Sequence, residues 1–312
     1  MTRHLAHEQS FELLGKRAVD LDCIRPATAP DPLISVVMPS FNRAGLIGRT
    51  ITSVLSQRLD RFELIIVDDG STDDTLDLLN DWDDRRIAVF QMRRNSGAPA
   101  ARNAGVKMAR SPLIAFQDSD DEWQPTLLDH HVQALKRADV SFCQLEQRYP
   151  SGRSFFPSTG WQLADDVYAQ LLGSSHISTQ TLAMTRAIFQ RVGGFDPAMP
   201  RFQDWDLVLR LARIGARFHY INEPLAIAHD SPDSLTRSLD KGIIGRQRLI
   251  EKHGEALAAQ PAALARHHYV MGSQLRTLRR FAEAQAQFAA VLQATPLNWR
   301  AAAQWLLASV HR

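Results

Sequence analysis

The chain has 312 residues, of which 45% are hydrophobic and 22% charged, and its formal net charge is +2. These values are ordinary for a soluble globular protein that holds one large domain and a smaller one. A nearly neutral balance gives no support for nucleic-acid binding. Cys23 and Cys143 form neither a disulfide framework nor a zinc motif, which favours a reducing compartment.

No apolar run approaches the ~20 residues that a membrane-spanning helix needs. Residues 1–12 contain charges and histidines where a signal peptide would be apolar. We therefore expect a cytoplasmic protein. Peripheral attachment to the inner face of a membrane stays open.

Residues 1–31 are expected to form an N-terminal extension. A short helix is predicted over 11–21, and three prolines follow within seven positions, at Pro26, Pro30 and Pro32. Because proline fixes φ and lacks a backbone donor, the end of this extension is predicted to be irregular.

Four short apolar runs then alternate with helical patterns, as is typical of strands buried on both faces. The strands are expected at 33–38, 64–67, 87–90 and 113–116. This order predicts an α/β fold with a mainly parallel central sheet flanked by helices, and ligands bind at the carboxyl ends of such strands. A further strand is expected at 140–147 and a helix beginning near Gln203.

Carboxylates follow two of these strands. Asp68 and Asp69 end the second strand, and Asp118 and Asp120 follow the fourth. Both ends should lie on one rim of a parallel sheet, where crowded carboxylates need a positive charge among them. Mn²⁺ or Mg²⁺, sharing its ligand shell with substrate phosphates, fits that need, although a single acidic loop could equally be solvated. Ser71 is predicted to cap the next helix.

Six segments in this order together resemble family 2 glycosyltransferases. They are SVVMPSFNR (35–43), VDDGSTDDT (67–75), NSGAPAARNAG (95–105), DSDDEW (118–123), VGGFD (192–196) and QDWDL (203–207). The resemblance implies a GT-A (nucleotide-diphospho-sugar transferase) fold over residues 32–240 and an inverting sugar transfer. Residues 241–312 are expected to form a separate helical region.

The resemblance also implies roles for single residues. The nucleotide-sugar is expected to contact the first strand end, the acidic pair and the third segment, at Pro39, Phe41, Asn42, Asp69, Arg102, Asn103 and Asp118. Asp120, together with Asp118, is expected to bind the metal. His229 is a further candidate ligand, with a plain surface histidine as the alternative. The stretch 231–238 is expected to act as a lid.

Asp204 corresponds to the general base of the family. In the first turn of the predicted helix it would be kept ionised by the positive helix end. Asp206 and Arg210 are expected to form a surface i,i+4 pair. The family often has Glu before this Asp, whereas this chain has Gln203.

The tail resembles one tetratricopeptide-type helical pair at 281–298, preceded by another helix. One such unit cannot bury its own apolar face. A helical cap on the catalytic domain is favoured over a surface for self-association or for an anionic membrane.

The expected function is transfer of a sugar from a nucleotide-diphospho-sugar, first of all a UDP-sugar, to a glycan or lipid-linked acceptor in cell-surface polysaccharide synthesis. The alternative is a catalytically inactive sugar-nucleotide-binding protein with a helical interaction module. A nucleotidyltransferase is disfavoured because residues 40–45 contain one glycine and no triphosphate loop.

Overall fold

The structure is a computed structural model that describes residues 21–158, 160–230 and 238–310. It comprises two compact units. Unit 1 contains the chain up to Lys136 and Ala183–Phe195, and unit 2 contains Arg137–Leu182 and the chain from Asp196 onward. The segment boundaries expected from the sequence, at residues 31 and 240, remain a prediction.

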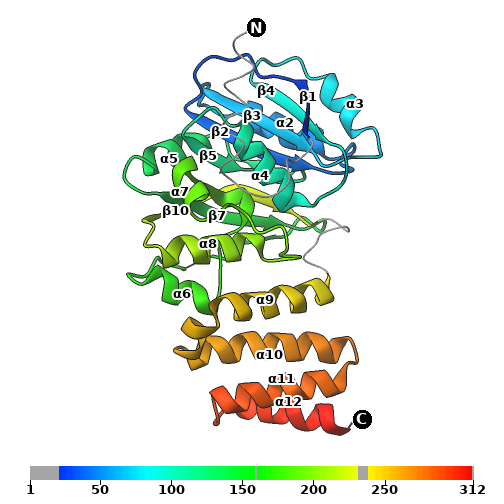
Figure 1. The fold of residues 1–312 in the computed structure, drawn as a ribbon, viewed down its shortest axis with the longest axis vertical. Helices are drawn as coiled ribbons and strands as arrows, with labels where there is room; N and C mark the ends of the chain where they lie inside the picture. Colours follow the sequence, from blue (N-terminus) through cyan, green and yellow to red (C-terminus); the bar gives the residue numbers. More distant parts are fainter. Residues whose placement is uncertain (1–20, 159, 231–237, 311–312) are drawn as a thin grey trace. The chain divides into compact units, whose positions relative to one another are not determined.

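Unit 1 is built on a sheet with the strand order β1-β4-β3-β2-β5-β9 (Figure 1). The strands are β1 (Leu21–Arg25), β2 (Ile34–Ser40), β3 (Phe62–Asp68), β4 (Ile87–Met92), β5 (Leu113–Phe116) and β9 (Leu182–Thr185). The four central strands β4, β3, β2 and β5 are parallel, and β1 and β9 are antiparallel to their neighbours. The four predicted strands and the mainly parallel sheet are therefore confirmed.

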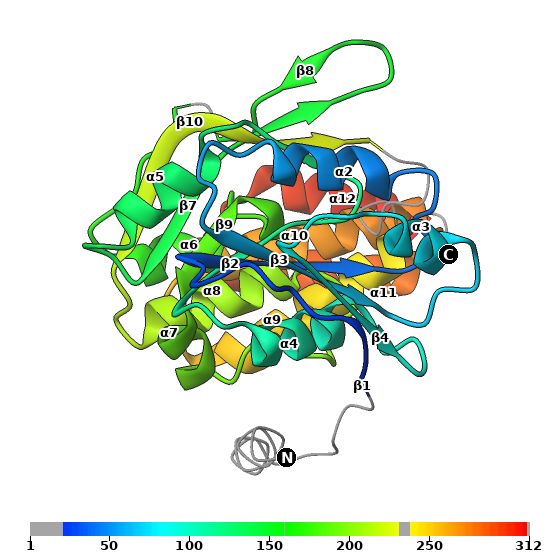
Figure 2. The ribbon, with the colours of Figure 1, turned by 90° about the horizontal axis from the view of Figure 1, so that it is seen from above.

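Helices cover both faces of this sheet. They are α2 (Ile47–Leu55), α3 (Thr75–Asn80), α4 (Ala98–Met108), α5 (Leu127–Ala134) and α7 (Arg186–Arg191). Figure 2 shows α2 and α4 on opposite faces of β2 and β3. Every residue of β2 and β3 is buried, which explains why their central residues, 36–38 and 64–67, are apolar without alternation.

Two local features differ from the sequence prediction. Strand β1 forms between the expected helix and the proline-rich stretch, where no strand was predicted, because its backbone pairs with the edge of β4. Helix α3 begins at Thr75, four residues after Ser71, so Ser71 does not cap it, and the Ser71 hydroxyl instead donates to the carboxylate of Asp68. The predicted helix at 11–21 lies almost wholly outside the described residues.

Unit 2 contains a parallel strand pair and a series of helices. Its strands are β7 (Val140–Arg148), β10 (Phe218–His229) and the short β8 (Ser154–Phe155), which pairs with the end of β7. Its helices are α6 (Val167–Gly173), the 3₁₀ turn Thr179–Thr181, α8 (Gln203–Arg213), α9 (Leu239–Ala258), α10 (Pro261–Thr277), α11 (Phe281–Ala294) and α12 (Trp299–Val310). The strand expected at 140–147 and the helix beginning near Gln203 are confirmed.

The last four helices stack in sequence order (Figure 1). Met271, Leu275 and Phe288 form the core between α10 and α11, and Trp305 of α12 packs against it. Gly272 makes this approach possible, because a Cβ there would lie 2.9 Å from the ring of Phe288. The C-terminal helices are confirmed, whereas their relation to tetratricopeptide repeats remains a prediction.

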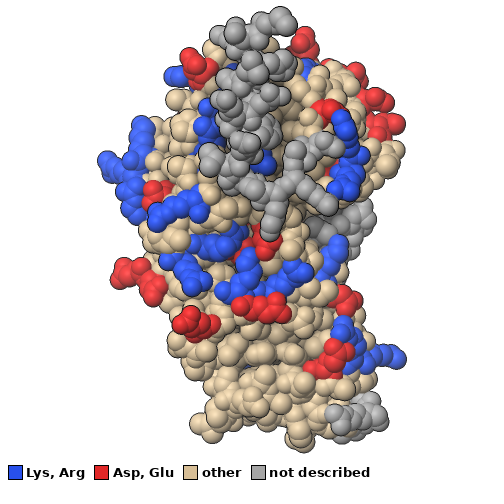
Figure 3. Space-filling view, in the orientation of Figure 1, with Lys and Arg blue, Asp and Glu red and all other residues tan. Residues whose placement is uncertain are grey.

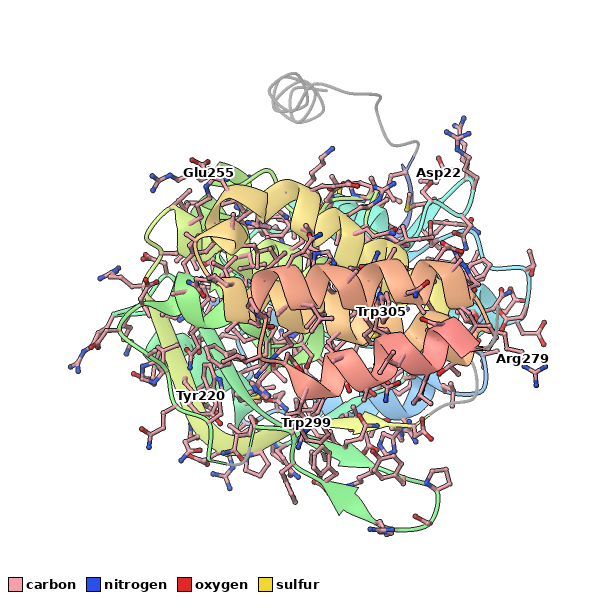
Figure 4. The ribbon with its side chains drawn as sticks, turned by 90° about the horizontal axis from the view of Figure 1, so that it is seen from below. Asp22, Tyr220, Glu255, Arg279, Trp299 and Trp305 are labelled. Atoms are coloured by element: carbon pink, nitrogen blue, oxygen red, sulfur yellow. The ribbon has the colours of Figure 1, made fainter. Side chains whose placement is uncertain are left out.

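The outer side of the last helices is apolar. Leu297, Trp299, Leu306 and Leu307 are exposed, Leu297 by 96% and Trp299 by 72%. In Figure 3 the lower end of the face, formed by α11 and α12, carries few charged side chains. Figure 4 shows Trp305 at the centre of α12, over α11, and Trp299 at its start.

Among the described helices, none combines the length and the apolarity that crossing a lipid bilayer requires.

Gly105 of α4 supplies the first testable prediction. A Cβ at this position would lie 2.5 Å from Cγ1 of Val37, a buried and stiff side chain of β2. Overpacking of this kind costs about 1–3 kcal/mol, so Gly105→Ala should lower the free energy of unfolding by that amount in urea titrations. Gly48→Ala is the matched control. Gly48 lies in α2 with no atom within 4 Å of its Cβ position, and this change should stabilise the protein by roughly 0.5–1 kcal/mol. Equal effects of the two changes would contradict the close packing of α4.

Candidate functional site

The loops after β2 and β3 are joined by hydrogen bonds. The backbone N–H of Asn42 donates to the Ser71 hydroxyl at 2.9 Å, and Asn42 Oδ1 accepts from the backbone N–H of Thr72 at 2.8 Å. The backbone N–H of Arg43 donates to Thr75 Oγ1 at 2.8 Å. Asn42 adopts a left-handed φ of 52°, a conformation that Asn tolerates better than most residues. The loop after β2 is therefore fixed by its neighbour.

Pro39 and Phe41 flank the end of β2. Pro39 lies buried within the strand, and Phe41 is 38% exposed just beyond it. An exposed aromatic ring at the carboxyl end of a parallel strand offers a flat apolar surface to a ligand. This placement is consistent with the base contact that was predicted for Phe41.

Asp69 is buried and held by backbone donors. Its carboxylate oxygens accept hydrogen bonds from the N–H groups of Ser96 and Gly97, at 2.8 and 2.7 Å, and its own N–H donates to the Ser40 carbonyl at 2.7 Å. Burial raises the pKa of Asp69, and the nearby charge of Asp68 adds to this, whereas the two N–H donors oppose it. Asp69 thus links the loops after β2, β3 and β4.

Asp118 is paired with Arg102. The guanidinium of Arg102 donates to Asp118 Oδ1 and lies over the ring of Phe195, with its carbon 5.5 Å from the ring centroid. Nδ2 of Asn103 donates to the Phe195 carbonyl at 2.8 Å, and Oδ1 of Asn103 accepts from the Phe195 N–H at 2.9 Å. Arg102 therefore holds Asp118, and Asn103 anchors the VGGFD segment. The predicted nucleotide contacts of Arg102 and Asn103 remain predictions.

The negative charge of Asp120 is less well compensated than the charges of Asp69 and Asp118. Its Oδ2 lies 3.9 Å from Nε of Arg43, and its backbone carbonyl accepts from Arg49 at 2.6 Å. Burial raises the pKa of Asp120, the charge of Asp118 raises it further, and Arg43 and Arg49 oppose this. A carboxylate in this situation gains most from an additional cation.

The donor set fits a hard divalent cation that is completed by phosphate oxygens. Asp118 and Asp120 are two carboxylates with side-chain exposures of 26% and 23%, so neither is sealed from a ligand. Mg²⁺ typically takes one or two carboxylates and obtains its other ligands from water and substrate phosphates. Within the described residues, no group of three or more His, Cys, Asp or Glu side chains gathers as a ready metal cage. This two-carboxylate set therefore requires the substrate to complete the shell.

Asp204 lies in the first turn of α8, in unit 2. Its Oδ1 accepts from the backbone N–H of Trp205 at 2.8 Å. Asp206, two residues on, forms the expected pair with Arg210 at 2.8 Å, but the expected surface position was wrong. Asp206 is fully buried and also pairs with Lys252 at 2.6 Å, because α9 packs over this side of α8. Asp206 therefore has a structural role, which is to hold α8 against α9.

His229 ends β10 in register with Arg148. Its role as a metal ligand remains a prediction. The expected lid at 231–238 falls, apart from Ser238, outside the described residues; Ser238 caps α9 by accepting from the N–H of Lys241.

Two residues of this site, Arg43 and Arg49, were not predicted from the sequence. Both are basic residues near the end of β2, and both contact Asp120, which follows β5. The only sequence signal for a role of Arg43 was its place in the SVVMPSFNR segment. The contact of both arginines with Asp120 becomes evident only when β2 and β5 pair in the sheet.

Comparisons with known proteins identify relatives of this chain. The model of glycosyl transferase family 2 matches residues 35–193, about half of the chain. The putative teichuronic acid biosynthesis glycosyltransferase TuaG of Bacillus subtilis (strain 168) is 41% identical over 113 residues, 36% of this chain and 45% of the relative. WfaP of Escherichia coli, a UDP-Glc:alpha-D-GlcNAc-diphosphoundecaprenol beta-1,3-glucosyltransferase, is 38% identical over 110 residues, 35% of this chain and 44% of the relative. The alignments thus span less than half the length of both relatives.

A solved structure shows the same fold. The mannosyltransferase PcManGT from Pyrobaculum calidifontis, in complex with GDP-Man and Mn²⁺, superposes with a TM-score of 0.60 at 21% identity. The match covers 98% of this chain and 86% of that one.

The backbone of Asn42 supplies a second prediction. Asn42→Gly removes the hydrogen bond to Thr72 and should cost about 1 kcal/mol of unfolding free energy. Asn42→Ala also forces a Cβ-bearing residue into the left-handed region and should cost roughly 1 kcal/mol more. Urea unfolding of the two variants measures the difference. An alanine variant as stable as the glycine variant would mean that φ at residue 42 is not constrained.

Proposed function

Because the chain belongs to glycosyl transferase family 2, we propose that it transfers a sugar, with inversion, from a nucleotide-diphospho-sugar to an acceptor hydroxyl. One observation carries the proposal. The loops after β2, β3 and β5 place Asp69, Asp118 and Asp120 at one rim of the sheet, each with its own partner. Asp69 accepts from the N–H of Gly97, and Asp118 accepts from Arg102. Arg43 joins the segment after β3 to Asp120.

In this proposal the donor is bound by unit 1. Phe41 and Asp69 contact the base and ribose, and Pro39, Asn42, Arg102 and Asn103 shape the nucleotide pocket. Asp118 and Asp120 hold Mn²⁺ or Mg²⁺, with Arg43 beside them. When bound, such an ion offsets the charge of the diphosphate as a Lewis acid. The Mn²⁺ in the complex of the mannosyltransferase supports this assignment.

Asp204 is the proposed general base. It accepts the proton of the attacking hydroxyl, for which an ionised carboxylate within hydrogen-bond reach is needed. The positive end of α8 favours its ionised form. The hydrogen bond from the N–H of Trp205 to Oδ1 fixes this carboxylate in the first turn of the helix.

The proposed donor is a UDP-sugar, and the proposed acceptor is a glycan or lipid-linked glycan of the cell surface. The relatives named for teichuronic acid synthesis and for a diphosphoundecaprenol acceptor support these classes. An inactive binding protein is less favoured, because Asp69, Asp120 and Asp204 are all present. A cytoplasmic location with peripheral membrane contact remains a prediction. Self-association through the helical tail also remains a prediction. The side chains that would form this contact are the exposed Leu297, Trp299, Leu306 and Leu307.

The first functional prediction concerns Asp204. Asp204→Asn should keep donor binding and stability but lower the transfer rate by roughly 10²- to 10⁴-fold, the usual contribution of a general base. Asp206→Asn is the matched control on the same helical turn. It leaves Arg210 and Lys252 without their buried partner and should lower the unfolding free energy by about 3 kcal/mol. Full turnover by Asp204→Asn would show that another group is the base.

The second functional prediction concerns the donor and the metal. UDP-, GDP- and dTDP-sugars are added with and without Mn²⁺, and the melting temperature is recorded. One nucleotide should stabilise the protein only with the metal, by about 2.7 kcal/mol at a hundredfold excess over its Kd. Asp120→Ala should abolish this metal-dependent part, whereas Asp77→Ala, an exposed change on α3, should not. Equal stabilisation of Asp120→Ala would contradict the metal assignment.

A further inference from the structure

Two arginines lie against the Phe202 ring at the start of α8, near Asp204 in the sequence. The guanidinium carbons of Arg201 and Arg246 lie 4.8 and 5.0 Å from the centroid of the Phe202 ring. Phe202 itself adopts a left-handed φ of 63° immediately before the helix. Arg201 and Arg246, called the arginine pair below, thus share one aromatic ring although 45 residues separate them in the sequence.

Two glycines of α9 bring the arginine pair together. A Cβ at Gly245 would lie 2.8 Å from the Arg201 carbonyl oxygen and 2.9 Å from Cδ2 of Phe202. A Cβ at Gly242 would lie 2.9 Å from Nη1 of Arg201. The turn before α8 therefore rests directly on the backbone of α9, and the head of Arg201 lies over Gly242.

Among the described residues, no carboxylate forms an ion pair or hydrogen bond with either member of the arginine pair. Asp204 nevertheless lies near enough to act on Arg201 electrostatically. Arg246 is half-buried, and its Nε is buried without a hydrogen-bond partner among the described residues. By contrast, Arg210 and Lys252 in the same unit pair with Asp206.

The hydrogen bond of Arg246 within the described part of the chain goes to a neutral group, the ring of His267. Nε2 of His267 faces the Leu172 carbonyl at 2.8 Å and must donate to it, so Nδ1 is left to accept from Arg246 at 3.3 Å. Burial lowers the pKa of His267 to about 4, so this ring adds no charge at neutral pH. Burial, with the charges of Arg201 and Arg266, lowers the pKa of Arg246 to about 10. The rings of Phe202 and, for Arg246, of Trp205 at 5.3 Å offset part of this positive charge. An anion would offset more of it.

We propose that the arginine pair is a binding site for a phosphate group of a substrate, beside Asp204. The fork of donors on each guanidinium matches phosphate oxygens, and the positive end of α8 adds to the attraction. No acceptor among the described residues takes a hydrogen bond from the guanidinium of Arg201. The site itself is independent of the proposed function. Its role in the reaction rests on that function, because the phosphate belongs to either the acceptor or the sugar donor.

Binding is tested with inorganic pyrophosphate and the full chain, in a chelator that removes divalent metals. Isothermal titration should show about tenfold weaker binding by Arg201→Gln than by the unaltered protein, as expected when charge-assisted hydrogen bonds to phosphate are lost. Gly242→Ala, which displaces the head of Arg201 but keeps its charge, should also weaken binding. Arg213→Gln is the control, because it removes the same charge from the exposed end of α8. Unchanged affinity in Arg201→Gln, or an equal loss in Arg213→Gln, would overturn the proposal.

Transfer assays then distinguish the two sources of the phosphate. The acceptors are one sugar linked through a diphosphate and the same sugar on a neutral group. If the acceptor supplies the phosphate, Arg201→Gln should lower kcat/KM for the first acceptor alone. If the donor supplies it, the KM for the donor should rise with both acceptors. A chain without transfer activity would sink the proposed function, while the pyrophosphate titration would still decide the site.

Discussion

The candidate site of unit 1 depends on Arg43, the residue at which three loops meet. Its backbone N–H is bonded to Thr75 in the segment after β3, and its side chain faces Asp120 after β5. Asn42, directly before it, is bonded to Ser71 and Thr72. Parallel strands deliver their loops to one rim of the sheet, and these contacts turn that rim into a defined site.

The carboxylates of the rim differ in how their charge is compensated. Asp69 is held by two backbone N–H groups, and Asp118 by the guanidinium of Arg102. Among the described residues, the carboxylate of Asp120 faces Nε of Arg43 at 3.9 Å, and Arg49 donates to the backbone carbonyl of Asp120 at 2.6 Å. A cation therefore has most to offer at Asp120, whereas Asp69 is arranged as a fixed acceptor. The three aspartates thus differ in their expected roles because the charges and hydrogen-bond donors around them differ.

In unit 2, the charged side chains around α8 fall into two groups. Asp206 is buried and matched by Arg210 and Lys252, whereas the arginine pair beside Asp204 has no carboxylate partner among the described residues. The first arrangement fixes the helix on α9. The second leaves positive charge available for a ligand, close to the carboxylate proposed as the base.

The strands could be predicted from local pattern, because the central residues of β2 and β3 are apolar at successive positions. The places of Asp69, Asp118 and Asp120 behind strands and the spacing of Asp206 and Arg210 were equally evident in the sequence. The burial of Asp206, the pairing of Asp118 with Arg102 and the shared ring of the arginine pair depend on the packing of distant segments. Local patterns follow from the geometry of one helix or strand, which a few neighbouring residues specify. Burial and ion pairing depend on which distant segment packs against that element, and the glycines that allow such packing are recognised only once their neighbours are known.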